Sequence, residues 1–412
     1  MYLPMPGRSS NSAVAQPASF PDPIHVPAGA WGRSRRLFAG LAAAGLALGA
    51  VAFAVDRPQF YHSWLTALVF GLTVALGSLF FVMLQHVTRA GWSVAVRRLA
   101  EISAWTIPFF AVLFLPLVAG MKDLFPWTGA EAAHDPLIRH KSAYLNPTFF
   151  FVRAALYFAV WTFLARYFLR RSLAQDESKD FRITIELQRR SAPGIILYGF
   201  ALTFMAFDWL MSADPHWYST IFGVYIFSGS TLSSFAFLTL VAMALRRGGY
   251  LAHTVRTDHY HDLGRLMFAF SVFWTYIAFC QFFLIWYGNI PEETVFYAHR
   301  LQGSWKAVSL FLAFGHFVVP FVLLMPRFTK RRPKFVAGMA VWILFIHYLD
   351  LHWIVMPNHH REGFAPCWVD LAALAAVLGV FLTLFTRKLA GHALVPAGDP
   401  RLPESLALEH LY

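Results

Sequence analysis

The residues best able to do chemistry begin in one apolar run, FDWLMSADPHWYSTIFGVYIFSGS at 207–230. Within it, two carboxylates and one imidazole, Asp208, Asp214 and His216, surround a proline. Ionisable groups are costly in an apolar environment, and they usually mark a proton path, an ion path or a ligand contact. The run therefore predicts proton or ligand chemistry inside a membrane.

A second group of ionisable residues lies in a later apolar run. His347 and Asp350 are spaced i, i+3, so on a helix they share one face and the carboxylate can orient the imidazole. A hydrogen-bonded pair of this kind can relay protons near neutral pH. His352 points to the side of that face. His347 with Asp350 is therefore the best candidate for a proton relay.

Two further histidines lie at other depths. His316 lies near the middle of an apolar run, four residues before Pro320, whose missing N–H can free a carbonyl for a water. His86 ends another run, with Glu101 nearby, and would mark a cytoplasmic mouth. The ionisable groups are denser towards the outer half, as expected of a site that exchanges protons with the external phase.

Each candidate has a structural alternative. Asp208 could accept hydrogen bonds from Trp or Tyr side chains in a packed bundle, while Asp214 and His216 could cap a helix at the Pro break. His316 could be a satisfied core histidine. A b-type haem held by His316, His347 or His352 is a rival use of these residues. Arg153, early in its run, is expected to extend its guanidinium outwards to the interface.

The elements that position these residues are membrane-spanning helices. Hydrophobic residues make up 58% of the 412 positions and charged residues only 14%, with a mean hydropathy of +0.51, which excludes a water-soluble globular protein. Ten apolar stretches approach the length of a span. They lie at about 37–55, 60–86, 104–121, 147–169, 193–213, 218–245, 265–288, 304–325, 335–356 and 367–386.

The basic residues orient these spans. Lys and Arg crowd alternate connections, at 33–36, 89–98, 170–190, 246–265, 327–334 and 387–388. By the positive-inside rule both termini are cytoplasmic, which requires an even number of spans. The net charge of +12 then needs no nucleic-acid partner, because the charges alternate from loop to loop and form no single stripe.

The remaining segments and the cysteines restrict the function further. Residues 1–32 are predicted to be a disordered cytoplasmic tail, 33–390 the ten-helix membrane domain, and 391–412 an irregular cytoplasmic tail. Cys280 and Cys367 have neither a CxxC nor a CxxCH context, so the chain cannot by itself hold an iron–sulfur cluster or a c-type haem. No phosphate-binding glycine motif is present.

The 207–230 run resembles the signature of the NrfD-like, polysulfide-reductase-type membrane subunits of bacterial alternative complex III, in particular the second of the two such subunits, called quinone-binding subunit 2. The aromatic stretch HYLDLHWIVMPNHH at 347–360, the ten spans and the length agree with it. The resemblance implies two four-helix bundles, from spans two to five and six to nine, with spans one and ten outside.

The resemblance also implies partners and cofactors. The partners are the bilayer, a sibling NrfD-like subunit, an iron–sulfur subunit, and multihaem and monohaem cytochromes c in the bacterial inner membrane. This subunit would carry no covalent cofactor and no metal. A quinone such as menaquinone would bind either here or to the sibling subunit, in which case this subunit would conduct protons or serve a structural role. Asp208, His347 and Asp350 would form the outer part of a proton relay, and Asp208→Asn would slow turnover without loss of assembly.

Two other functions remain open from the sequence. A proton-coupled secondary transporter also suits ten spans with intramembrane acids, although its binding site would be marked by broken helices. A purely structural anchor for the haem and iron–sulfur subunits would use the buried acids as polar contacts between helices.

Overall fold

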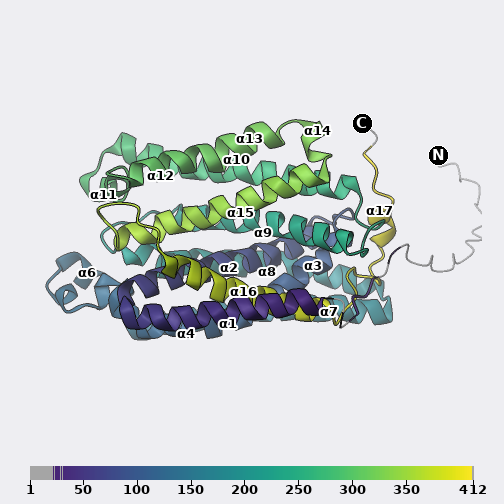
Figure 1. The fold of residues 1–412 in the computed structure, drawn as a ribbon, viewed down its shortest axis with the longest axis horizontal. Helices are drawn as coiled ribbons and strands as arrows, with labels where there is room; N and C mark the ends of the chain where they lie inside the picture. The colour runs from purple at the N-terminus through teal and green to yellow at the C-terminus, as the bar shows by residue number, and fades with distance from the viewer. Residues whose placement is uncertain (1–21, 23, 28, 30, 411–412) are drawn as a thin grey trace, which may run out of the picture.

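A computed structural model describes residues 22, 24–27, 29 and 31–410 of the chain (Figure 1). Ten helices in this range are long and apolar enough to cross a membrane, which confirms an all-α, multi-pass membrane fold. The prediction of a disordered tail at 1–32 falls mostly on residues outside the described range.

The ten spans follow the predicted order. They are α1 (Gly32–Val55), α2 (Arg57–Val87), α3 with α4 (Val94–Trp105, Ile107–Ala119), α7 (Pro147–Ser178), α8 with η3 (Phe181–Trp209, Met211–Ala213), α9 (Phe222–Arg247), α10 (Thr257–Gly288), α12 with η4 and α13 (Trp305–Leu312, Ala313–Val318, Val319–Leu324), α15 with η5 (Pro333–Val355, Met356–Asn358) and α16 (Trp368–Leu389).

Short helices complete the described chain. They are α5 (Met121–Leu124), η1 (Pro126–Thr128), η2 (Ala130–Ala133), α6 (Pro136–His140), α11 (Pro291–Arg300), α14 (Arg327–Lys330) and α17 (Leu402–Leu406).

The spans form two four-helix bundles, as expected. Helices α2, α3/α4, α7 and α8 pack into the first bundle, and α9, α10, α12–α13 and α15 into the second. Helices α1 and α16 pack on each other and lie outside, against α2. Helix α2 is 94% buried over its most apolar window whereas α1 is 22% buried, so α2 is a central helix and α1 a peripheral one.

The two bundles meet where α2 contacts α9. A methyl group at Gly77 would overlap the backbone carbonyl of Ser230, so only glycine allows this close approach. The Ser230 hydroxyl donates to the Thr73 carbonyl across the same contact at 2.7 Å. We call this contact the glycine seam; it fixes the two bundles relative to each other.

Both described termini lie at one end of the molecule (Figure 1). We call this the terminal end, and the opposite end, with α6 and α11, the far end. Residues 391–410 are mostly irregular, as predicted, but they pack against the helices and do not form a free tail. Leu394 and Val395 are fully buried, the segment contains α17, and the Leu394 N–H donates to the Ile24 carbonyl at 2.7 Å.

The third span begins ten residues, or about three turns, earlier than predicted, at Val94 in place of 104. Arg97, Arg98 and Glu101 lie inside this helix and are buried. The two arginines form ion pairs with Glu101, so their charges are compensated inside the helix. A hydropathy pattern counts each charge separately and therefore places the start of the span too late.

Candidate functional site

The carboxylate of Asp350 lies buried inside the second bundle, 1% exposed. It accepts hydrogen bonds from the Tyr225 hydroxyl on α9 and, at 3.2 Å, from the Trp274 indole N–H on α10. Among the described residues no Lys or Arg forms an ion pair with it. Asp350 is thus held by neutral donors alone, and uptake of a proton would remove an uncompensated buried charge.

His347 lies one turn from Asp350 on α15, but the predicted hydrogen bond between them is wrong. The His347 Nε2 atom contacts the Thr73 hydroxyl of α2 at 3.0 Å. That hydroxyl is also 2.9 Å from the Phe70 carbonyl, to which it donates, so it accepts from Nε2. Nδ1 is then the unprotonated nitrogen, and it is buried without a partner among the described residues.

His316 completes the group from the eighth span. It lies in the π-helix η4, just before Pro320, where backbone hydrogen bonds join residues five apart in place of four. The Gly315 carbonyl accepts from the Trp342 indole at 2.7 Å, so a side chain fills the role predicted for a water. The His316 ring stacks on Trp274 at 3.7 Å, and both ring nitrogens are buried without a described partner.

We call His316, His347 and Asp350 the central cluster. One ligand atom from each lies within 4.8 Å of the others, and all three residues are buried. Three such groups can exchange protons, and their donor types also suit a divalent transition metal. The partnerless nitrogens show that the cluster has unused hydrogen-bonding or ligand capacity.

An aromatic cavity of ≈ 490 Å³ lies beside the two hydrogen-bond donors to Asp350. Tyr225 and Trp274, the two donors to Asp350, form part of its wall, together with Tyr297 and Trp353. Phe279, also in the lining, is 59% exposed on the outer surface of the bundle, so the cavity opens towards lipid. A flat, lipid-soluble ring suits such a site in size and polarity.

Asp208 does not belong to the central cluster. Its carboxylate accepts from Arg153 of α7 through Nε at 2.8 Å and Nη2 at 2.9 Å, and from the Tyr157 hydroxyl at 2.7 Å. The prediction that Arg153 extends outwards is wrong: the residue is 6% exposed and its guanidinium lies over the Tyr144 ring at 3.8 Å. Asp208 is thus a structural anion with a fixed counter-charge.

Asp214 and His216 lie at the far end, outside the spans. No side-chain cap is formed by Asp214, whereas the His216 Nε2 atom contacts the Asp135 carboxylate at 2.6 Å. The backbone N–H of Ile138, with that imidazole and the Leu137 N–H, lowers the pKa of Asp135. The predicted capping role is therefore wrong for both residues.

His352 faces away from the central cluster, as predicted, and joins a polar network that the sequence reading missed. Its Nε2 atom lies 3.5 Å from the carboxylate of Asp370, which also accepts from Ser63 at 2.6 Å and from the Cys367 N–H at 3.0 Å. Gln59 donates to Ser63 at 2.9 Å. Asp370 is the third residue of α16, a position where an aspartate usually caps the helix. The sequence therefore offered no reason to connect it with His352.

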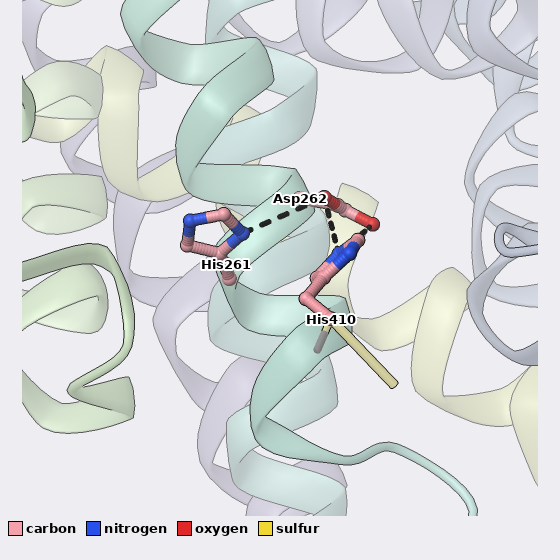
Figure 2. Close-up of side chains that lie close together, drawn as sticks. All are labelled: His261, Asp262 and His410. Atoms are coloured by element: carbon pink, nitrogen blue, oxygen red, sulfur yellow. Dashed lines mark hydrogen bonds and ion pairs between the residues drawn. The ribbon is translucent and has the colours of Figure 1, made fainter. Parts of the chain in front are cut away.

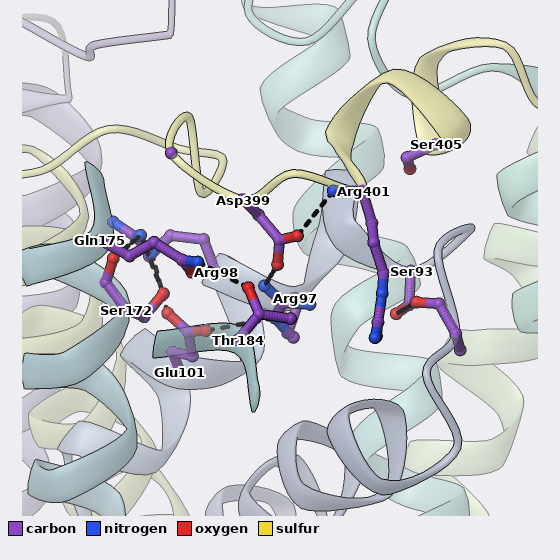
Figure 3. A network of polar contacts seen from close by, with 12 residues as sticks. Ser93, Arg97, Arg98, Glu101, Ser172, Gln175, Thr184, Asp399, Arg401 and Ser405 are labelled. Atoms are coloured by element: carbon purple, nitrogen blue, oxygen red, sulfur yellow. Dashed lines mark hydrogen bonds and ion pairs between the residues drawn. The ribbon is translucent and has the colours of Figure 1, made fainter. Parts of the chain in front are cut away.

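His86 lies near the terminal end of α2 but does not open to the surface, because it is 1% exposed. The predicted cytoplasmic mouth is closed in this structure. Figure 3 shows the network that seals this end. Arg97 binds Glu101 and Asp399 of the C-terminal segment, and Arg98 donates to Glu101 at 2.9 Å and to Asp176 of α7 at 2.7 Å.

A second group with metal-ligand geometry lies at the same end (Figure 2). The His410 Nε2 atom is 3.0 Å from both carboxylate oxygens of Asp262 on α10, and the His261 Nδ1 atom is 3.6 Å from one of them. Arg265 also contacts this carboxylate at 3.4 Å. The Arg265 charge competes with a metal for Asp262, so the group serves mainly to hold the C-terminal segment on α10.

Comparison with models of known protein families gives no match for this chain, and comparison with characterised proteins gives none either. The assignment of function therefore depends on the site itself. The sequence placed Tyr225 in the run at 207–230 but gave it no role. Trp274 and Thr73 carried no signal beyond their position in apolar helices.

Proposed function

We propose that this chain is an integral subunit of a respiratory quinol:electron-acceptor oxidoreductase of the alternative complex III kind. In this proposal the aromatic cavity binds the quinol ring and the central cluster takes up its protons. The main support for this proposal is that Tyr225 and Trp274 have two roles. They line the cavity, and they donate hydrogen bonds to the buried carboxylate of Asp350. A bound ring would lie one hydroxyl group away from a buried proton acceptor.

The proposed reaction separates electrons from protons. A quinol such as menaquinol enters from the bilayer, loses two electrons and two protons, and leaves as the quinone. The electrons pass to an iron–sulfur or haem group on a partner subunit. Tyr225 accepts a proton from the quinol hydroxyl as it donates its own to Asp350, and His347 Nδ1 offers the next acceptor.

The orientation of the chain is part of the proposal. The alternation of basic connections supports a cytoplasmic terminal end, and we propose a bacterial inner membrane as the location. His347 is the fifteenth residue of α15, about 21 Å from its start at the terminal end, so the central cluster lies nearer the far end. Protons taken from quinol would then leave to the outer phase.

A proton-coupled secondary transporter is the second candidate. One observation favours it, the π-helical segment η4 beside His316, because irregular helices often mark the binding sites of carriers. The closed network at the terminal end disfavours it, since a carrier must open to both sides.

The first test is purification of the tagged chain in mild detergent, with an optical spectrum and identification of its companions. Haem c absorption with an iron–sulfur subunit and a second membrane subunit would support the proposal. A colourless, solitary protein would contradict it and favour the transporter.

The second test uses the purified complex and quinol titration. Ala278 lines the cavity without contacting Asp350, so Ala278→Phe should fill the cavity and raise the KM for quinol. Ala44→Phe, on the exposed face of α1 away from this cavity, is the matched control. An unchanged KM in Ala278→Phe would exclude this cavity as the quinol site, and would leave an anchoring role for the chain.

A further inference from the structure

A groove on the outer surface of the first bundle has an apolar part, which we call the furrow, and a part that is lined by arginines. It has a volume of ≈ 620 Å³ and runs between α4 and α7. Pro108 and Ala111 form one wall, and Ala155, Ala159 and Thr162 of α7 form the other. Small side chains at these three positions leave the furrow open, since they are spaced i, i+4, i+7 and share one face of the helix.

The same face of α7 continues into basic residues. Arg166 and Arg170 follow Thr162 at i+4 and i+8, line the same groove and are exposed. Arg171, also in the lining, is already bound to Glu186 on α8, whose other oxygen accepts from Tyr167 at 2.6 Å. Among the described residues neither Arg166 nor Arg170 forms an ion pair, so two guanidinium groups remain for an external anion.

The length of this stripe matches one leaflet of a bilayer. Ala155 and Arg166 are eleven residues apart, or ~16 Å along the helix. Half of a bilayer's hydrocarbon core is about 15 Å. The furrow therefore extends from the middle of the membrane to the interface at the terminal end, where the arginines lie at the depth of lipid headgroups.

We infer that this groove binds an anionic phospholipid of the leaflet at the terminal end. Arg166 and Arg170 hold its phosphate, and one acyl chain lies in the furrow beside Ala155 and Ala159. Arginine suits this role because its planar group can donate two hydrogen bonds to a phosphate. The site lies in the first bundle, away from the central cluster, and the inference is independent of the proposed function.

The test uses the full chain with any partners that co-purify, washed free of lipid in detergent. The thermal midpoint is measured during titration with dioleoylphosphatidylglycerol, with dioleoylphosphatidylcholine, and with inorganic phosphate. We expect only the anionic lipid, dioleoylphosphatidylglycerol, to raise the thermal midpoint. An equal rise with phosphatidylcholine, or with phosphate alone, would overturn a specific phospholipid site.

Two variants separate the headgroup from the acyl chain. The pair Arg166→Gln with Arg170→Gln should raise the half-saturating lipid concentration on the order of tenfold, because each arginine near an anionic headgroup contributes a measurable attraction. Ala159→Leu should weaken binding by filling the furrow without a change of charge. Arg387→Gln, an exposed arginine at the end of α16, is the matched control and should titrate like the wild type. A double variant that titrates like this control would contradict the inference.

Discussion

Arg153 holds Asp208 in a two-pronged contact, at 2.8 and 2.9 Å, whereas Asp350 is held by a tyrosine and a tryptophan and by no described cation. Each aspartate lies near the end of the last helix of its bundle. The two bundles thus place the same residue type in different electrostatic settings. Asp208 has the fixed counter-charge of Arg153, whereas the Asp350 carboxylate has only neutral hydrogen-bond donors.

The Arg153 contact changes the result expected from Asp208→Asn. Removing the carboxylate leaves a buried guanidinium without its counter-charge, which costs about 3–5 kcal/mol when a buried pair is broken from one side. We expect a lower thermal midpoint and poor assembly, contrary to the sequence-based expectation of intact assembly. Scanning fluorimetry in detergent measures the midpoint. The double variant Arg153→Met with Asp208→Leu should recover most of the loss, and equal instability of single and double variants would contradict this account.

Asp350→Asn should behave in the opposite way. The amide oxygen can still accept from Tyr225 or Trp274, and no described cation loses a partner, so the fold should persist. Loss of the proton acceptor should lower quinol-dependent electron transfer in the purified complex by roughly 10²–10⁴-fold. Asp214→Asn, at the far end, is the control and should retain activity. Wild-type turnover in Asp350→Asn would remove the central cluster from the mechanism.

The glycine seam predicts a steric effect. Gly77→Ala should disrupt the contact of α2 with α9, because the added methyl group meets the Ser230 backbone, which cannot move like a flexible side chain. Gly199→Ala, on α8, is the matched control, since nothing lies within 4 Å of the added atom. We expect a lower yield of monodisperse protein on size-exclusion chromatography for Gly77→Ala only. Equal yields from the two variants would show that the seam tolerates separation.

Acidification should loosen the C-terminal segment at His392. Burial, with the nearby charges of Lys388 and Arg98, lowers the pKa of His392, while Asp176 opposes this and His25 adds to it. The docked state therefore prefers the neutral imidazole. Its contribution is complete above the ordinary pKa of about 6.5 and is lost as the pH falls from there through the lowered value.

Hydrogen exchange of the 391–406 backbone, corrected for the intrinsic pH dependence, measures this docking. Exchange should rise more between pH 7.5 and pH 5.5 in the wild type than in His392→Gln. The same rise in both proteins would assign the effect to other groups.

The sequence predicted the fold well because membrane insertion depends on composition. The ten spans, their order and the two bundles all agree with the structure. The sequence also identified the three residues of the central cluster and paired His347 with Asp350. It did not bring His316 to them, because His316 lies on another span, in the π-helical segment η4. The partner of Asp208 was missed because Arg153 lies 55 positions away. Spacing along one helix predicts a shared face, whereas contacts between helices depend on packing that the sequence does not display.

The C-terminal segment has a mechanical consequence. Asp399 binds Arg97 on α3, the Gly398 N–H donates to Asp176 on α7 at 3.0 Å, and the Ser405 hydroxyl lies 3.2 Å from His259 on α10. These helices belong to both bundles, so the segment acts as a strap across them. A rocking motion of one bundle against the other would have to break this strap. The strap therefore favours a backbone that stays in place, and the proposed quinol chemistry needs only protons and a small ligand to move.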